Sequence, residues 1–272
     1  GLAMARVMGI LNTTPDSFSD GGLWSDPARA VRRAVEMVAQ GADIIAVGGE
    51  STRPGALSVG TQQELDRVLP VVEAIVAESA VTVSVDTCKP EVMTAAVAAG
   101  AGLINDVFAL RHAGALEAAA SLGVPVCLMH MQGRPRDMQA DPHYADVVGE
   151  VEEFLLQRAR ACEAVGISRD CIWIDPGFGF GKTLEHNIAL FRALPRLCGH
   201  GYPVLVGISR KSMLGALTGR KVDERLAASV TAAVLAARGG VAAVRVHDVA
   251  ETVDALRVMQ RLDPGPVGDC LS

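Results

Sequence analysis

Aromatic residues are scarce in this sequence: Phe, Trp and Tyr make up 4% of the 272 residues, although 50% of the residues are hydrophobic. The core must therefore be built mainly from Ala, Val, Leu and Ile side chains. No apolar run reaches the ~18 residues that a membrane-spanning helix needs, which excludes an integral helical membrane protein. None of the six cysteines forms a CxxC pair, so we interpret them as reduced thiols, mostly buried.

An excess of positive charge is also lacking. The formal net charge is −6 at pH 7, which argues against nucleic acid as the main partner. It leaves room for a local basic site that binds a phosphorylated small molecule. Gly1, Leu2 and Ala3 precede Met4, and no signal or transit segment follows. We therefore expect a cytoplasmic protein whose partners are neither nucleic acids nor membranes.

Short β-rich runs alternate with longer helical patterns along the whole chain. The candidate strands are Arg6–Leu11, Asp43–Val47, Val81–Val85, Leu103–Asn105, Val126–Met129, Ile172–Ile174, Val204–Val206 and Ala243–Val246. The helical stretches are Pro27–Gln40, Gln62–Glu78, Pro90–Ala99, Ala115–Leu122, Asp146–Val165, Leu184–Leu197, Asp223–Arg238 and Val249–Arg261. Eight such units predict an α/β protein with a single (β/α)8 barrel, the TIM-barrel architecture, over residues 4–262. Residues 263–272 are expected to form a loose tail.

Side chains alternate between the two faces of a strand, so their parity predicts which of them point into the barrel. In the run from Val81 to Asp86, the valines face the helices, which leaves Ser84 and Asp86 in the lumen. The same alternation places Asp175 and Arg245 inside the barrel. Charged side chains are therefore expected in an otherwise apolar interior.

Polar residues recur at the C-terminal ends of the predicted strands, which is where barrel active sites are built. They are Asn12, Asp86, Asn105, Asp175, Lys211, Arg245 and His247. A single Asp or Asn after a strand is most often a turn former or a helix cap, but capping explains seven polar residues at one end poorly. Lys211 and Arg245 would also need carboxylate partners or an anionic ligand.

Three Gly-containing loops stand out, at residues 9–22, 48–55 and 175–182. The first has the composition of a mobile connector. The second combines small residues and hydroxyls with Arg53, which suits either a tight turn or phosphate binding by backbone N–H groups and a guanidinium. The third lacks the GxxxxGK[ST] spacing of a P-loop.

Together these segments resemble the dihydropteroate synthase family. The resemblance extends from Met8 to about Arg261 and includes further motifs in order, which are Ser84–Thr87, Ile104–Asp106, Leu128–Gly133, Ser209–Ser212 and Arg245–Asp248. It implies that 6-hydroxymethyl-7,8-dihydropterin diphosphate and p-aminobenzoate condense to 7,8-dihydropteroate and diphosphate by a dissociative displacement, with Mg²⁺ as cofactor. It also implies a homodimer and the binding of sulfonamide inhibitors.

The resemblance gives roles to individual residues. The implied pterin-binding set is Asp86, Asn105, Met129, Asp175, Phe180, Lys211 and Arg245. The implied diphosphate-binding set is Asn12, Thr52, Arg53, Arg245 and His247, with Asn12 as the metal ligand. The implied p-aminobenzoate set is Phe18, Pro54, Ser209 and Lys211. The implied catalytic residues are Asp86, Asp175, Lys211, Arg53 and Asp20, the last of which would order the first loop over the site.

Two other functions are compatible with the same residues. A pterin-dependent methyltransferase would share the Asp and Asn residues that bind the pterin, but it would need a corrinoid partner. The motifs Thr52-Arg53 and Ser209–Lys211 favour the synthase over it. A catalytically silent barrel would bind pterin without turnover.

Ala46 departs from the family pattern, which has an acid at this position. Parity places Ala46 in the lumen, near the C-terminal end of the second strand. In one interpretation, Ala fills the lumen and a water replaces the carboxylate oxygens. In the other, which we favour, a group that supports the diphosphate or the Mg²⁺ is missing.

Overall fold

The computed structural model describes residues 4–12, 26–52 and 54–265. Its strands are β1 (Arg6–Asn12), β2 (Ile44–Gly48), β3 (Thr82–Asp86), β4 (Leu103–Asp106), β5 (Val126–Met129), β6 (Ile172–Asp175), β7 (Leu205–Gly207) and β8 (Ala243–Val246). Every predicted strand is present, and its ends are shifted by at most one residue. The alternation of side chains therefore located the sheet well.

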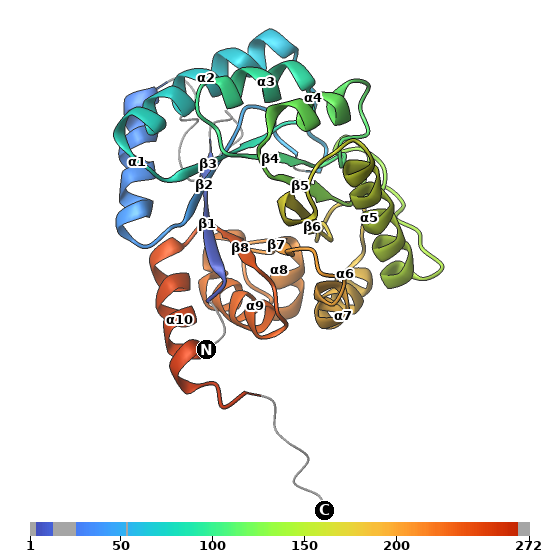
Figure 1. Ribbon diagram of the computed structural model, residues 1–272. Coiled ribbons are helices and arrows are strands. Elements are labelled where there is room, and N and C mark those ends of the chain that lie inside the picture. Colours follow the sequence, from blue (N-terminus) through green and yellow to red (C-terminus); the bar gives the residue numbers. More distant parts are fainter. Residues whose placement is uncertain (1–3, 13–25, 53, 266–272) are drawn as a thin grey trace, which may run out of the picture.

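The strands form one parallel sheet in the order β6-β5-β4-β3-β2-β1-β8-β7. The two ends of this order meet, because Ile174 of β6 forms a parallel bridge with Val204, next to β7. The Ile174 N–H also donates to the Pro203 carbonyl at 2.9 Å. The sheet thus curls round toward closure, and Figure 1 shows the helices on the outside of the ring of strands. The predicted (β/α)8 barrel is confirmed.

Helices follow the strands around the barrel. They are α1 (Pro27–Ala39), α2 (Thr61–Glu78), α3 (Pro90–Ala98), α4 (Ala115–Leu122), α5 (Val147–Ala164), α6 (Leu184–Arg192), α7 (Leu194–Cys198), α8 (Ser212–Thr218), α9 (Leu226–Arg238) and α10 (Val249–Leu262). Two short 3₁₀ helices, η2 (Arg169–Cys171) and η3 (Val222–Glu224), precede β6 and α9. Within the described ranges, no helix has both the length and the apolar character needed to cross a membrane.

Helix α1 shows how local sequence sets the start of an element. The Asp26 side chain accepts a hydrogen bond from the Arg29 N–H at 3.1 Å, and Pro27 occupies the first turn, where its missing N–H costs nothing. The buried face of the helix is formed by Ala30, Ala34 and Met37. Their spacing of four and three residues puts them on one side of the helix, against the sheet.

Two of the predicted helices were wrong in detail, and one helix was missed. The predicted helix Leu184–Leu197 is divided into α6 and α7, because Pro195 lies in the first turn of α7 and cannot continue a helix from the preceding turn. The predicted helix Asp223–Arg238 begins only at Leu226, after η3. Helix α8 was not predicted. These differences lie outside the strands and leave the barrel unchanged.

Two apolar clusters lie on the two faces of the sheet. The cluster between the sheet and the helices contains Ile45, Val47, Val83 and Val85. The cluster inside the barrel consists of Met8, Ile44, Ala46, Leu103, Cys127, Trp173, Leu205 and Ala243. Neighbouring residues of one strand fall into different clusters, as parity predicted. The lumen is a packed layer, and it forms the floor on which the polar strand ends lie.

The described cysteines carry free thiols, as predicted, but most of them are only partly buried. They are Cys88, Cys127, Cys162, Cys171 and Cys198, of which Cys127 and Cys162 are buried; Cys270 lies outside the described residues. Burial raises the pKa of the Cys127 thiol well above its usual value and that of Cys162 to about 11. Both thiols are therefore protonated and unreactive at neutral pH.

Candidate functional site

The residues predicted from the strand ends gather at one rim of the barrel. Asp86, Met129 and Asp175 are the last residues of β3, β5 and β6, and Asn105 and Arg245 are next to last in β4 and β8. The pairing register sets Asp86 beside Asn105 and Met129 beside Asp175. Because all the strands are parallel, these five residues lie at the C-terminal end of the barrel.

Loops bring further predicted residues to the same end of the barrel. Thr52 and Pro54 follow β2, Ser209 and Lys211 follow β7, and His247 follows β8. The backbone of Asn12 ends β1, whereas Phe18, Asp20 and Arg53 lie outside the described residues. The roles of those last three residues stay predictions.

An ion pair between Asp175 and Arg245 forms the charged centre of the site. Nη1 of Arg245 lies 3.4 Å from Oδ2 of Asp175, and the two side chains are 13% and 1% exposed. Oδ1 of Asp175 accepts a hydrogen bond from the Gly177 N–H at 2.8 Å. Gly207 on the adjacent β7 leaves space for the guanidinium, because a Cβ there would lie 2.6 Å from Nη1 of Arg245. Arg245 thus has the carboxylate partner that its burial requires.

Asp86 is a second carboxylate that faces the same guanidinium. Burial raises its pKa to about 6, whereas the charge of Arg245 and hydrogen bonds from Asn105 and Ser84 act in the opposite direction. The charge of Asp175 adds to the rise. Asp86 is therefore ionised at pH 7 and becomes protonated in mildly acidic solution. Two carboxylates around one guanidinium make this region suitable for a ligand that develops positive charge.

Two buried polar atoms of this group have no hydrogen-bond partner within the described residues. They are Oδ1 of Asn105 and Nε of Arg245. A buried polar atom without a partner costs about 1–3 kcal/mol, so a ligand that pairs with it gains affinity. One atom is an acceptor and the other a donor. A donor group of a ligand could pair with Oδ1 of Asn105, and an acceptor group could pair with Nε of Arg245.

Lys211 bounds the site on the β7 side. Its Nζ donates a hydrogen bond to the Phe178 carbonyl oxygen and lies 4.7 Å from the centre of the Phe180 ring, a cation–π distance. Burial lowers the pKa of Lys211 to about 7, although the charge of Asp175 opposes this change and that of Arg245 reinforces it. An anionic ligand beside Lys211 would shift it toward the charged form.

Ser209 and His247 join the loops that follow β7 and β8. Oγ of Ser209 lies 2.8 Å from Nδ1 of His247 and also accepts the His247 backbone N–H at 3.2 Å. The neighbouring Arg210 forms an ion pair with Asp248 at 3.0 Å, which adds a second link between the same loops. These contacts place the predicted p-aminobenzoate residue Ser209 directly beside the predicted diphosphate residue His247.

Met129 and Phe180 belong to a small apolar cluster above the lumen. Its buried members are Met129, Met131 and Met138, and the partly buried rings of Phe108 and Phe180 pack against them. Methionine side chains are flexible and polarisable, and they make favourable contacts with aromatic rings. The cluster can therefore form the apolar wall of a pocket for a flat ring, as the resemblance implied for Met129 and Phe180.

Our sequence reasoning missed Lys182, which fixes the loop after β6. Its side chain is 1% exposed. Nζ donates to the carbonyl oxygens of Gly177 at 2.8 Å and Phe180 at 3.0 Å, and it lies 2.9 Å from Nδ1 of His130. Burial lowers the pKa of His130 to about 2, so its neutral ring can accept this hydrogen bond. Gly177 has φ +70°, and a Cβ there would collide with the His130 carbonyl.

Ala46 lies where parity placed it. It is 2% exposed, belongs to the apolar cluster in the lumen, and pairs in register with Ile10 and Ser84. Oγ of Ser84 lies 3.5 Å from Oδ1 of Asp86. An acid at position 46 would thus enter the lumen one strand away from the Asp86 carboxylate.

A cleft of about 690 Å³ opens beside these residues on the same end of the barrel. It is lined by the loops that follow β2, β3, β4 and β5 and includes Lys89, Arg111 and Arg134. The strand-end residues Asp86, Asp175 and Arg245 are absent from its lining. The cleft is therefore a neighbour of the predicted site and does not coincide with it.

Known proteins resemble the chain over almost its whole length. The family described as "Pterin binding enzyme" matches residues 8–247. The dihydropteroate synthase of Escherichia coli K12 is 52% identical over 259 residues, which cover 95% of this chain and 92% of that protein. A Yersinia pestis dihydropteroate synthase in a sulfonamide drug complex has a TM-score of 0.91 at 50% identity, covering 94% of both chains. A Xanthomonas albilineans dihydropteroate synthase with 4-aminobenzoic acid has a TM-score of 0.90 at 55% identity, covering 97% of this chain and 94% of that one.

Proposed function

The chain belongs to the pterin-binding enzyme family, among its dihydropteroate synthases, and we propose that Asp86, Asp175 and Arg245 bind and activate its pterin substrate. The reaction joins 6-hydroxymethyl-7,8-dihydropterin diphosphate to p-aminobenzoate and releases diphosphate. The observation that carries the residue assignment is the buried, unpartnered Oδ1 of Asn105 beside two carboxylates. Donor groups on a pterin edge supply the hydrogen bonds that these acceptor oxygens need.

The protein binds the pterin ring by its edge and by its faces. The carboxylates of Asp86 and Asp175 and Oδ1 of Asn105 accept hydrogen bonds from donors along the edge. Arg245 stacks on one face of the ring, while Met129 and Phe180 supply the apolar wall. A ring that lacks the matching groups would leave buried polar atoms unpaired and would be rejected.

The bond that breaks joins the methylene carbon of the pterin to an oxygen of the diphosphate. The electron-rich dihydropterin stabilises the carbocation that forms, so a dissociative displacement fits this site. Asp86 and Asp175 stabilise the cationic ring, and Arg53, Thr52 and His247 hold the leaving diphosphate. The arylamine nitrogen of p-aminobenzoate then bonds to the methylene carbon and releases a proton. This nitrogen is mostly unprotonated at pH 7, so a strong general base is not needed.

The p-aminobenzoate site is assigned to Phe18, Pro54, Ser209 and Lys211. The Lys211 ammonium complements the carboxylate of this substrate, and a bound anion would favour the charged form of the lysine. Asp20 is assigned to order the first loop over the bound substrates and so exclude water. Sulfonamides resemble p-aminobenzoate in shape and should occupy the same site, in keeping with the drug complex of the Yersinia pestis relative.

Mg²⁺ is the expected cofactor, and Asn12 is its assigned protein ligand. Among residues 4–12, 26–52 and 54–265, no group of three or more His, Cys, Asp or Glu side chains could hold a metal ion. Mg²⁺ is often bound through one or two protein oxygens together with waters and substrate phosphates. One amide oxygen as the protein ligand fits that mode, and the backbone of Asn12 pairs in register with Gly48, where the loop toward Thr52 begins. When bound, the ion would neutralise charge on the diphosphate.

The substitution Ala46→Asp is expected to raise kcat/KM, or to strengthen the response to Mg²⁺, by about tenfold. The new carboxylate would restore the acid that the family pattern has at this position and would support the diphosphate or metal end of the site. The measurement is kcat/KM across a Mg²⁺ titration, with Ala46→Asn as a control of equal size and no charge. Overlapping curves for the original protein and Ala46→Asp would show that Ala46 is a neutral replacement.

The reaction itself is tested by measuring diphosphate release with each substrate omitted in turn. We expect release to require both the pterin diphosphate and p-aminobenzoate, with one 7,8-dihydropteroate formed per diphosphate. A methyltransferase would release no diphosphate and would need a corrinoid partner. A silent barrel would bind the pterin without turnover. Either result would overturn the proposed function.

The homodimer that the resemblance implies is supported by apolar side chains outside the site. Leu217, Val222 and Leu226 are 57%, 54% and 44% exposed, and they follow one another from α8 through η3 to the start of α9. Such grouping is typical of an interaction surface. We assign this surface to contact with a second copy of the chain.

Leu217→Glu is expected to shift the protein from dimer to monomer, because it would place a charge in an apolar interface. Light scattering after gel filtration measures the mass directly. Val258→Glu is the matched control, since Val258 is also 57% exposed but lies on α10. A dimer that persists in Leu217→Glu, or a monomeric original protein, would refute this assignment.

A further inference from the structure

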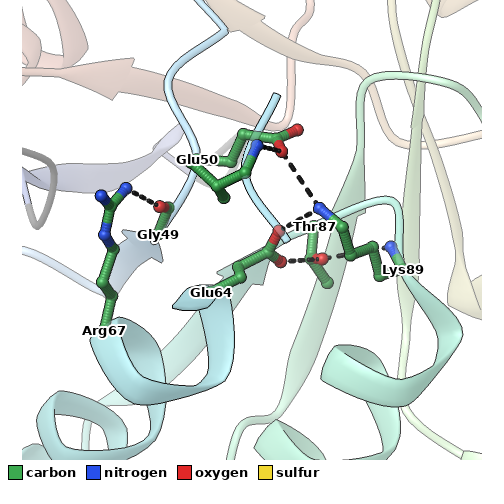
Figure 2. A network of polar contacts seen from close by, with 7 residues as sticks. Gly49, Glu50, Glu64, Arg67, Thr87 and Lys89 are labelled. Carbon is green, nitrogen blue, oxygen red and sulfur yellow. Dashed lines mark hydrogen bonds and ion pairs between the residues drawn. The ribbon is translucent and has the colours of Figure 1, made fainter. Parts of the chain in front are cut away.

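Two carboxylates and one ammonium group form a network at the loop that follows β2 (Figure 2). Nζ of Lys89 is 3.0 Å from Oε2 of Glu50 and 2.8 Å from Oε1 of Glu64. The Thr87 hydroxyl donates to the other oxygen of Glu64, and the Lys89 backbone N–H donates to the Thr87 hydroxyl oxygen at 3.2 Å. The network therefore joins three elements, namely the loop after β2, the first turn of α2 and the loop after β3.

This network holds the two ends of the loop after β2 together. Oε2 of Glu50, the atom that binds Lys89, also accepts a hydrogen bond from the Val59 N–H at 2.8 Å. Residues 50 and 59 flank the segment that carries Thr52 and Pro54. One carboxylate oxygen thus ties the two ends of this segment together, and Lys89 holds that oxygen in place.

Burial makes the network difficult to replace with water. The Glu64 side chain is 1% exposed, and those of Lys89 and Glu50 are 19% and 17% exposed. Removing Lys89 would leave Glu64 as a buried carboxylate without its cation, which is strongly unfavourable. Burial alone would lower the pKa of Lys89, but hydrogen bonds and charges from Glu64 and Glu50 raise it. The lysine is therefore cationic at neutral pH.

The same network is attached to the pterin-binding end of β3. Thr87 follows Asp86 directly, and the Thr87 N–H donates to the Asn105 carbonyl at 3.1 Å. Because the Thr87 hydroxyl also binds Glu64, the position of the Asp86 backbone is linked to the base of the loop after β2. Arg67 adds a further link, since its Nη1 donates to the Gly49 carbonyl at 2.8 Å.

We propose that Lys89 is a positioning residue that holds the loop carrying Thr52 and Pro54 at a fixed place relative to Asp86. This inference rests on the proposed function, in which that loop contacts the diphosphate and p-aminobenzoate while Asp86 binds the pterin. A substrate that binds to a loop no longer held in place must order that loop on binding, which weakens its binding and raises its KM. Lys89 thereby acts through Glu50 and Glu64, without contact with the reacting atoms.

The test compares Lys89→Met with Lys89→Arg and with Lys221→Met, a matched control at an exposed lysine in the turn before η3. Four quantities are measured: KM and kcat for p-aminobenzoate, the affinity for 6-hydroxymethylpterin without diphosphate, and the hydrogen exchange rate of the Val59 amide. In Lys89→Met we expect KM to rise by about tenfold, pterin affinity to stay within about twofold and the Val59 amide to exchange faster. Lys89→Arg should recover most of the effect, and Lys221→Met should match the original protein.

A second variant covers the case in which Lys89→Met does not fold. Glu50→Leu keeps the buried pair of Lys89 and Glu64 but removes the oxygen that accepts from the Val59 N–H, so it should also accelerate exchange at Val59 and raise KM. Unchanged exchange and KM would overturn the proposal, as would a fall in kcat and stability with KM unmoved. If the original protein released no diphosphate with p-aminobenzoate, the proposed function would be refuted. The exchange rate of the Val59 amide would still show whether Lys89 anchors the loop.

Discussion

Replacing Asp175 by Asn is expected to reduce kcat/KM by an amount equivalent to about 2–4 kcal/mol of transition-state stabilisation. The carboxylate is 1% exposed and lies 3.4 Å from the Arg245 guanidinium. Its charge faces the position at which the pterin ring becomes cationic. An Asn side chain can still accept the hydrogen bond from the Gly177 N–H, so the loop after β6 should keep its shape.

Steady-state kinetics with both substrates measure this effect, and thermal unfolding checks that the variant is folded. Asp254→Asn is the matched control, because Asp254 is an exposed residue of α10 and belongs to none of the proposed binding sets. We expect the control to keep the original kcat/KM. If Asp175→Asn also kept it, Asp175 would have no part in stabilising the transition state.

The Asp86→Asn variant is expected to lose a similar amount of kcat/KM. Its kcat/KM should also no longer fall as the pH decreases into the acidic range. Burial raises the pKa of Asp86 to about 6. Below that pH the carboxylate of the original enzyme takes up a proton and loses the charge that stabilises the cationic pterin. Its kcat/KM should therefore fall as pH decreases through about 6, whereas Asp86→Asn should give a low and flat profile there.

The profile of kcat/KM against pH from 5 to 9 separates this effect from that of Lys211. The pKa of Lys211 is lowered to about 7, so its charged form is lost as pH rises, on the opposite side of the optimum. Asp86→Asn should keep the alkaline limb and lose the acidic one. An acidic limb near pH 6 that persists in Asp86→Asn would assign that titration to another group.

The alternation of side chains predicted the barrel and much of its site. Val83 and Val85 pack toward the helices while Ser84 is buried and bonded to Asp86, so parity alone placed the carboxylate. Parallel strands then bring Asp86 and Asp175 to one rim, which is a property of the topology. The ion pair between Arg245 and Asp175 follows from the need of a buried guanidinium for a partner.

Contacts between distant loops could not be predicted in the same way. Lys182 reaches His130 because Gly177 allows the loops after β5 and β6 to come into contact. No periodic pattern in the sequence predicts such a contact. Glu64 did leave a signal that was overlooked. It precedes Val68 by four residues and so lies on the buried face of α2. A charged residue in phase with an apolar stripe indicates a buried ion pair, here with Lys89.

A crystal structure with the pterin diphosphate bound tests the central claim most directly, which is that the strand ends form the pterin site. We expect the ring edge to pair with Asp86, Asn105 and Asp175, including Oδ1 of Asn105, and one face of the ring to stack on Arg245. The diphosphate should extend toward Thr52 and His247. A pterin bound in the neighbouring cleft beside Arg111 and Arg134, with Asn105 and Arg245 untouched, would contradict the account.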